Sequence, residues 1–187
     1  MIGPVVLAVV ALERVAELAL SRRNARWALA CGGVESGQVH FRVMVAFHAL
    51  FLAACFFEPR WANRPFHPAQ AAACIVVLLL AQALRWWSID TLGPRWNARV
   101  IVVPGMLPVT SGPYRRLRHP NYVAVIVEMI ALPLVQGAWI TAVIATLGNA
   151  LLLRTRISVE ERALGDPWAQ AFRGTPRWIP RGGRARA

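Results

Sequence analysis

Long apolar runs alternate with short Arg-containing connections along this chain of 187 residues. Five runs reach or approach the ~20 residues that an α-helix needs to cross a bilayer. They cover approximately residues 2–20, 41–57, 69–87, 122–135 and 138–153. The pattern therefore predicts an all-α integral membrane protein with about five transmembrane helices.

Two details refine these spans. The fourth run is short and is followed by Pro133 and Gly137, which predicts a tight helical hairpin with the fifth run. The first run has no basic residue ahead of it, and Arg22 and Arg23 separate it from Cys31. These features oppose a cleaved signal peptide or a lipoprotein site, so the first run is interpreted as a retained helix.

Composition supports this class. Hydrophobic residues make up 57% of the chain and charged residues 16%, whereas soluble domains have about 45–50% and about 25%. All 21 basic residues are Arg, against 9 acids, and the net charge is +12. Because these Arg residues lie between apolar runs, they are interpreted as topology determinants and not as a nucleic-acid surface. The three cysteines show no CxxC spacing, so neither a disulfide framework nor a metal site is expected.

The distribution of Arg predicts an orientation. Residues 85–120 hold six Arg and the tail from Arg154 holds eight, whereas residues 58–68 hold two. With five crossings, the Arg-rich segments share one side if the N-terminus is outside, and that side should be cytoplasmic. The all-Arg, Ala-rich composition suggests a GC-rich bacterial genome. We therefore expect a bacterial inner-membrane protein with a cytoplasmic C-terminus.

The chain is expected to form a single domain in three parts. Residues 1–90 would provide three N-terminal spans, residues 91–180 a half that bears the motifs, and residues 181–187 a flexible basic tail. Residues 91–122 contain eight Gly and Pro residues, so they cannot form one helix. Within this segment, residues 100–103 and Leu107 are expected to be half-buried. A long irregular segment between two spans is usually functional.

His119 immediately precedes Pro120, so we expect it to be extended, with a helix beginning at Pro120. Its ring would then lie beside free backbone N–H groups, where an anionic ligand group can bind. A purely structural role for His119 is the alternative, and the neighbouring Arg115, Arg116 and Arg118 are compatible with a basic collar at the membrane surface.

Acidic residues within the apolar runs need partners or water. Glu13 and Glu17 are one helical turn apart with Arg14 between them, and Glu128 lies in the fourth run. A charge at the centre of the membrane costs roughly 2.5–3.5 kcal/mol on insertion scales. An Arg14–Glu17 pair with Glu13 near the membrane surface is one interpretation, and a functional role in a wet cavity is the other.

Arg156 and Glu160 follow the fifth run at i, i+4 spacing, near Arg154 and Glu161. They could form an ordinary surface ion pair. Alternatively, the two carboxylates could bind the amine and ribose hydroxyls of a nucleoside ligand.

Three motifs together resemble a known family. Gly112-Pro113-Tyr114, Arg118-His119-Pro120-Asn121-Tyr122 and Glu160-Glu161-Arg162-Ala163-Leu164 are similar to the GxY…RHPxY…EExxL pattern of isoprenylcysteine carboxyl methyltransferases. These are integral-membrane enzymes that use S-adenosylmethionine and are relatives of phospholipid methyltransferases. The N-terminal half resembles a bacterial branch, some members of which methylate alkylpyrones or alkylresorcinols.

The resemblance implies a set of site residues. The backbone of Met106, Leu107, Pro108 and Val109 would contact the cofactor, S-adenosylmethionine, together with Tyr114, His119, Pro120, Asn121, Tyr122 and Glu160. Arg156 would hold a carboxylate or another anionic acceptor. Two positions depart from the family pattern: Ala124 stands where Gly is frequent, and Arg99 lies near a cofactor-binding Gln of eukaryotic members, so no role is carried over to Arg99.

Methyl transfer from a sulfonium requires alignment more than acid–base chemistry. A carboxylate acceptor is already ionised, whereas a phenol or enol would benefit from a base, for which His119, Glu128 or Glu13 are candidates. The expected partners are a lipid-like small-molecule acceptor and membrane lipids, without nucleic acid; the sequence does not give the oligomeric state. A non-catalytic membrane carrier or assembly subunit, or a membrane reductase of similar topology, are the alternative functions.

Overall fold

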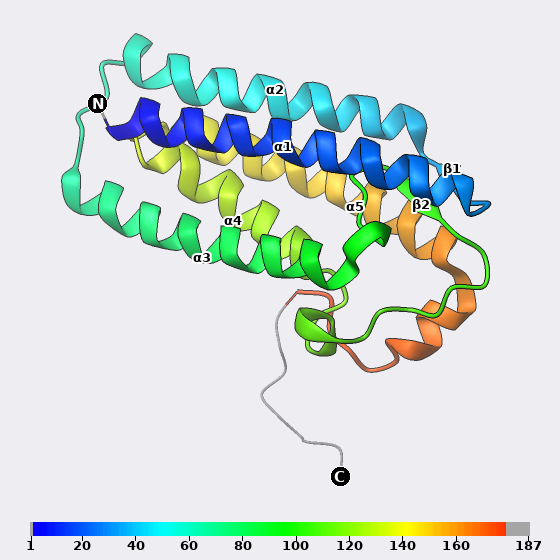
Figure 1. Cartoon of the computed structure of the whole chain (residues 1–187). Coiled ribbons are helices and arrows are strands. Elements are labelled where there is room, and N and C mark those ends of the chain that lie inside the picture. Colours follow the sequence, from blue (N-terminus) through cyan, green and yellow to red (C-terminus); the bar gives the residue numbers. More distant parts are fainter. Residues whose placement is uncertain (1, 179–187) are drawn as a thin grey trace.

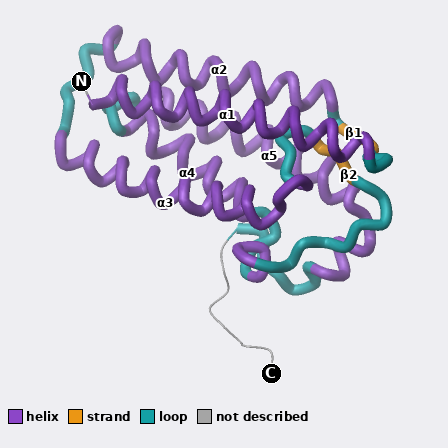
Figure 2. Tube along the Cα trace, in the orientation of Figure 1, coloured by secondary structure: helices purple, strands orange, loops and turns teal. Residues whose placement is uncertain are grey.

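The computed structural model describes residues 2–178, of which most are helical (Figures 1 and 2). The predicted all-α class is confirmed, with 75% helix. The predicted tail at 181–187 lies outside the described residues. The elements in chain order are α1 (Ile2–Ala30), β1 (Val34–Ser36), α2 (Gln38–Trp61), α3 (Pro68–Leu92), η1 (Gly93–Arg95), β2 (Val100–Val102), η2 (Gly112–Arg115), α4 (Pro120–Leu134) and α5 (Trp139–Ala171).

The five helices run side by side as a bundle in which successive helices reverse direction (Figure 1). α4 packs between α3 and α5, and α2 packs against both α5 and α1. The core is built from apolar side chains of all five helices, among them Leu7, Phe51, Leu78, Met129 and Ala145. This packing places every long connection at one of two ends of the bundle.

Three helices of the described chain are long and apolar enough to cross a membrane: α2, α3 continued to Arg95, and α5. α1 carries three charged residues within its apolar part, and α4 has only 15 residues. The outer faces of the long helices expose large aliphatic side chains such as Leu50, Leu80 and Leu147. Such a surface is suited to lipid contact. Crossing by α1 and α4 remains a prediction.

The predicted helical hairpin is present. α4 ends at Leu134 and α5 begins at Trp139, and the backbone reverses through Gly137 at a φ of 71°. Glycine adopts this left-handed conformation without the steric cost that a Cβ would impose. The hairpin places α4, which follows His119, alongside the part of α5 that precedes Glu160.

A buried carboxylate from α2 caps the start of α5. The Glu58 side chain accepts hydrogen bonds from the backbone N–H groups of Ile140 at 3.1 Å and of Thr141 at 2.6 Å. Free N–H groups at a helix start need partners, and the helix dipole favours a negative charge there. Glu58 thereby joins two helices at the end of the bundle opposite to the loop-rich one.

Replacing Glu58 with Ala should lower the free energy of unfolding by about 2 kcal/mol, because two N–H groups at the helix start, one of them buried, lose their acceptor. Thermal unfolding in detergent measures this change. Replacing Arg64, which lies 3.6 Å from Glu58 and is partly exposed, should cost less than about 1 kcal/mol. Equal losses in the two variants would contradict the capping role.

Most of the irregular chain gathers at the opposite end, near β1 and β2 (Figure 2). β1 pairs antiparallel with β2, with Glu35 opposite Ile101. The Arg99 guanidinium is hydrogen-bonded to the Glu35 carboxylate, with Nε 2.6 Å from Oε1. In addition, Asn24 of α1 donates to the carbonyl oxygen of Trp96 at 2.8 Å. These long-range contacts fix the start of the loop that precedes α4.

The predicted Arg-rich segments lie mainly at this end, at the end of α1, in the 93–119 connection and beyond the apolar part of α5 (Figure 1). Arg85 is an exception. It was assigned to the basic connection, but it lies within α3 and is only 4% exposed. The assignment was wrong because Arg85 pairs with carboxylates on neighbouring helices, which a count along the sequence does not reveal.

Candidate active site

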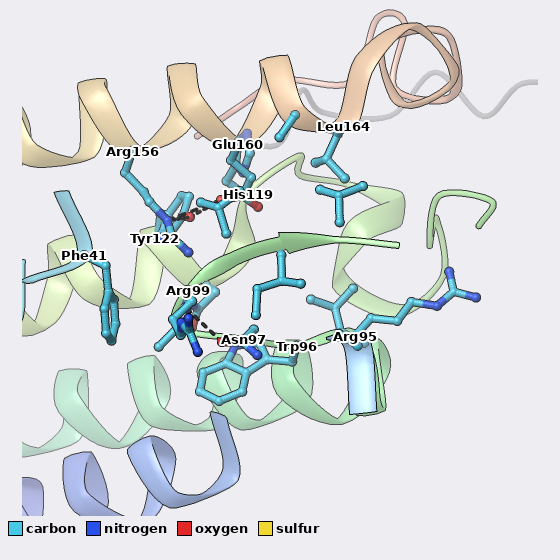
Figure 3. A pocket seen from close by; sticks show the side chains of 18 of the residues that line it. Phe41, Arg95, Trp96, Asn97, Arg99, His119, Tyr122, Arg156, Glu160 and Leu164 are labelled. Carbon is cyan, nitrogen blue, oxygen red and sulfur yellow. Dashed lines mark hydrogen bonds and ion pairs between the residues drawn. The ribbon is translucent and has the colours of Figure 1, made fainter. Parts of the chain in front are cut away.

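A cavity of about 880 Å³ opens at the loop-rich end and extends between the helices. Its wall includes residues from all five helices and from the 95–109 segment. Figure 3 shows α5 side chains, such as Arg156 and Glu160, on one side of it, and Trp96, Asn97 and Arg99 on the other. Pockets for small ligands usually measure about 300–1,000 Å³, so this cavity lies in the upper part of that range.

The structure brings nearly all of the predicted site residues to this one cavity. Those lining it are Met106, Leu107, Pro108, Val109, Tyr114, His119, Asn121, Tyr122, Arg156 and Glu160. Pro120 is buried at the first position of α4, where the predicted helix start is confirmed. Glu128 is not part of the wall. It lies eight residues further along α4, about 12 Å at 1.5 Å per residue.

Arg156, Tyr122 and Glu160 form one hydrogen-bonded chain (Figure 3). Arg156 Nε donates to the Tyr122 hydroxyl at 3.0 Å, and this hydroxyl donates to the Glu160 carboxylate. Arg156 Nε also lies 3.7 Å from Glu160 Oε2. Because Arg156 is only 4% exposed, this is not an ordinary surface ion pair. The arrangement holds a cation beside the cavity in a fixed orientation.

His119 lies between two aromatic rings. Its ring centroid is 5.3 Å from that of Tyr122 and 5.5 Å from that of Trp168. Nε2 is 3.1 Å from Glu161 Oε1. An ionised carboxylate only accepts hydrogen bonds, so Nε2 carries the proton. In the neutral ring, Nδ1 is then unprotonated and can accept a hydrogen bond. Glu161 therefore fixes both the orientation and the tautomer of His119.

The chain beyond Glu161 contributes residues that the sequence reasoning missed. α5 bends at Gly165, where φ is 67°, and Pro167 follows. The bend returns Trp168 and Phe172 onto Tyr114, with which they form a small core cluster. Burial raises the pKa of the Tyr114 hydroxyl above its ordinary value of 10. Gly165 is the sequence feature that could have indicated this return.

The 95–109 segment forms the wall opposite α5. Residues 101–103 are half-buried as expected and Val100 is fully buried, but Leu107 is 79% exposed, so the expectation for Leu107 was wrong. The carbonyl oxygen of Leu107 accepts an exposed hydrogen bond from Arg95 Nη1 at 2.6 Å, which holds the backbone here at the surface. Across the cavity, the buried Oδ1 of Asn121 has no partner within the described chain. A bound ligand could supply one.

Glu128 belongs to a second cluster, deep between α1, α3 and α4. Its Oε2 is 2.6 Å from Arg85 Nη2 and 3.6 Å from Arg14 Nη1. Arg14 is 3.0 Å from Glu17 and 3.4 Å from Glu13, so the expected Arg14–Glu17 pair is confirmed as part of a larger network. Glu128 and His119 are therefore not brought together, and the paired Glu128 is poorly placed to act as a base there.

The pKa of Glu161 predicts a pH effect on stability. Partial burial raises this pKa, but hydrogen bonds from Arg177 and His119 outweigh it, so the pKa lies below the ordinary value of 4.5. A lowered pKa in the folded state stabilises the protein above pH 4.5, and this stabilisation is lost as the pH falls through the folded-state value. Glu161→Gln should therefore lower the melting temperature at pH 7 more than at pH 4. An equal loss at both pH values would contradict this.

Comparisons with known proteins agree with the geometry. The sequence model of the isoprenylcysteine carboxyl methyltransferase family matches residues 73–166. Uncharacterized protein YpbQ of Bacillus subtilis (strain 168) is 34% identical over 161 residues, which cover 86% of this chain and 95% of that protein.

Two further relatives are more distant. An uncharacterized protein of Haemophilus influenzae is 27% identical over 152 residues, which cover 81% of this chain and 88% of that protein. The cobalt-zinc-cadmium resistance protein CzcN of Cupriavidus metallidurans is 30% identical over 145 residues, 75% of this chain and 62% of its own length. The match to the family model includes His119, α4 and most of α5, with Arg156 and Glu160. The chain belongs to the isoprenylcysteine carboxyl methyltransferase family, and this membership suggests a membrane methyltransferase.

Proposed function

We propose that the protein transfers the methyl group of S-adenosylmethionine to a carboxyl or hydroxyl oxygen of a lipid-like acceptor at the membrane. The observation that carries the proposal is the single cavity lined by His119, Tyr122, Arg156 and Glu160. One part of its wall is polar and belongs to the loop-rich end. The remainder lies between the helices, and most of the side chains that line it there are apolar, as a lipid-like acceptor requires.

The residues present fit S-adenosylmethionine. The Glu160 carboxylate and the unpaired Oδ1 of Asn121 are acceptors for ammonium or ribose donors. Tyr122 and Trp168 also line the cavity, and aromatic rings attract cations such as a sulfonium. When bound, this cofactor supplies an electrophilic methyl group. The segment 106–109 lines the same cavity and offers backbone groups.

Arg156 is suited to orient the acceptor. A buried guanidinium attracts a carboxylate or a developing oxyanion, and the bond to Tyr122 restricts its rotation. Alignment of the reacting atoms is the main requirement of this displacement and can contribute up to about 7–11 kcal/mol. A carboxylate acceptor would need no base. For a hydroxyl acceptor, His119 Nδ1 is suited to act as the base, since His119 lines the cavity and Glu161 holds the Nε2 proton.

Neither alternative function accounts for this constellation. A carrier or assembly subunit would not require the hydrogen-bonded chain of Arg156, Tyr122 and Glu160, nor a histidine held in place by a carboxylate. A reductase would require a nicotinamide site. In a thermal-shift measurement, S-adenosylmethionine should raise the melting temperature, whereas NADH or NADPH should not.

The direct test is transfer of a tritiated methyl group from S-adenosylmethionine to a bacterial lipid extract by the detergent-purified protein. Label should appear in the lipid fraction, and its release by mild alkali would distinguish a methyl ester from a methyl ether. Glu160→Gln should abolish transfer, whereas the exposed Asp166→Asn on the same helix should retain it. Transfer that persists undiminished in Glu160→Gln, or melting temperatures raised by nicotinamides alone, would contradict the proposal.

A further inference from the structure

The inner part of the cavity holds a cluster of polar side chains, although it lies between helices. Arg14, Glu17, His48 and Arg85 line the same cavity as the candidate active site. They come from α1, α2 and α3, within the helical bundle. The cofactor and methyl-acceptor residues proposed above do not include them.

Hydrogen-bonding capacity in this region is left unsatisfied. Glu17 is 7% exposed and Arg85 is 4% exposed. Glu17 Oε1, Arg85 Nε and Arg14 Nε are buried and have no hydrogen-bond partner among residues 2–178. Buried polar groups are normally paired, and leaving one unpaired is destabilising. The χ3 torsion of Glu has a broad range of allowed angles. A small rotation of the Glu17 carboxylate about this bond would therefore turn its unpaired oxygen toward the cavity that the side chain lines.

His48 adds an acceptor. Its Nδ1 is 2.8 Å from the carbonyl oxygen of Met44. A carbonyl oxygen only accepts, so Nδ1 of the neutral ring carries the proton and Nε2 is an acceptor. The inner region therefore offers a carboxylate oxygen and a ring nitrogen as acceptors, and guanidinium N–H groups as donors.

The charges limit what can bind there. Arg14 and Arg85 carry two positive charges, and their partners Glu13, Glu17 and Glu128 carry three negative charges when ionised. An anionic group would be repelled by this excess and could not donate to Glu17. An ammonium group could not accept from Arg85. A hydroxyl group both donates and accepts, so it satisfies both side chains without adding charge.

We propose that this inner region is a subsite for a hydroxyl group of the acceptor, remote from the oxygen that is methylated. The proposal rests on the proposed function in assigning the other end of the ligand to Arg156. Tyr122, which binds Arg156, and Glu128, which binds Arg85, are six residues apart on α4, so the two groups of the acceptor would be separated by about 9 Å along the helix. The expected acceptor is thus a chain molecule with an acidic or hydroxyl head group and a second hydroxyl group about 9 Å from it.

The test compares two probes that differ by one hydroxyl group, 7-hydroxyheptanoate and heptanoate. Their dissociation constants are measured by calorimetry on the detergent-purified full chain, without cofactor, so the result does not depend on methyl transfer. Wild type should bind 7-hydroxyheptanoate at least tenfold more tightly. Equal affinities, including no binding of either probe, would overturn the subsite. If the proposed function alone were wrong, the protein would still prefer the hydroxylated probe tenfold but would not transfer a methyl group to lipid.

Variants of two carboxylates on α1 test whether Glu17 is responsible for the preference for the hydroxylated probe. Glu17→Leu should lose the tenfold preference, and Glu17→Gln, which keeps one oxygen, should lose less of it. Glu13→Leu removes the same charge one turn away on α1, but Glu13 is bound to Arg14 and Trp86 and does not line the cavity. It should retain the preference. Retention by both Glu17 variants, or loss in Glu13→Leu alone, would overturn the assignment.

Discussion

Replacement of Arg156 with Met should lower kcat/KM for the methyl acceptor by about 100-fold, which is about 2.7 kcal/mol of transition-state stabilisation at 1.36 kcal/mol per tenfold. Arg156 is the buried cation that lies beside the cavity and is held by the Tyr122 hydroxyl at 3.0 Å. Methionine has similar length but cannot pair with an acceptor oxygen. Steady-state kinetics with labelled S-adenosylmethionine measures the loss.

Two controls test whether Arg156→Met loses activity through the acceptor and not through a general change in structure. Arg154→Met removes the same charge two residues earlier on α5, where the side chain is exposed, and should leave kcat/KM within about twofold of wild type. S-adenosylmethionine binding by Arg156→Met should remain measurable, because Glu160 and His119 are unchanged. Loss of cofactor binding together with activity would assign Arg156 to the cofactor and contradict its role toward the acceptor.

Replacement of Arg85 with Met should lower the free energy of unfolding by about 3–5 kcal/mol. Arg85 bridges Glu128 at 2.6 Å and Glu17 at 3.6 Å, and the side chains of all three residues are at most 9% exposed. Without the guanidinium, Glu128 would keep only Arg14 at 3.6 Å as a charged partner. Chemical unfolding in detergent, followed by circular dichroism, measures the change.

The cause can be isolated by a second substitution. Arg85→Met combined with Glu128→Leu should recover most of the stability, because an apolar pair can replace a buried ion pair at little cost. Arg42→Met, at an exposed position on α2, should change stability by less than about 0.5 kcal/mol. If the double variant were as unstable as Arg85→Met, the loss would come from packing and not from the unpaired charge.

Periodic and local features of the fold could be predicted from the sequence. The apolar runs gave the positions of the five helices, and Pro133 with Gly137 gave the hairpin. Pro120 gave the start of α4 because proline fits the first turn of a helix. Features that depend on long-range pairing could not be predicted. β1 and β2 have three residues each, too few to show a periodic pattern.

The site was predictable where its motifs are contiguous. His119, Tyr122 and Glu160 were expected together and do line one cavity. Glu128 was placed at the same site because its position along the chain does not reveal that Arg85, 43 residues away, is its partner. Trp168 was missed because the bend at Gly165 returns it to His119. These errors have one cause: the partner of a buried group depends on how the helices pack.

S-adenosylmethionine should bind at the polar end of the cavity, and calorimetry on the detergent-purified protein measures this binding directly. Wild type and Asp166→Asn should bind with micromolar affinity, whereas His119→Ala and Glu160→Gln should lose most of that affinity while retaining the wild-type circular dichroism spectrum. Absence of binding by folded wild-type protein, or equal binding by all four proteins, would contradict the assignment of this cavity to a methyltransferase.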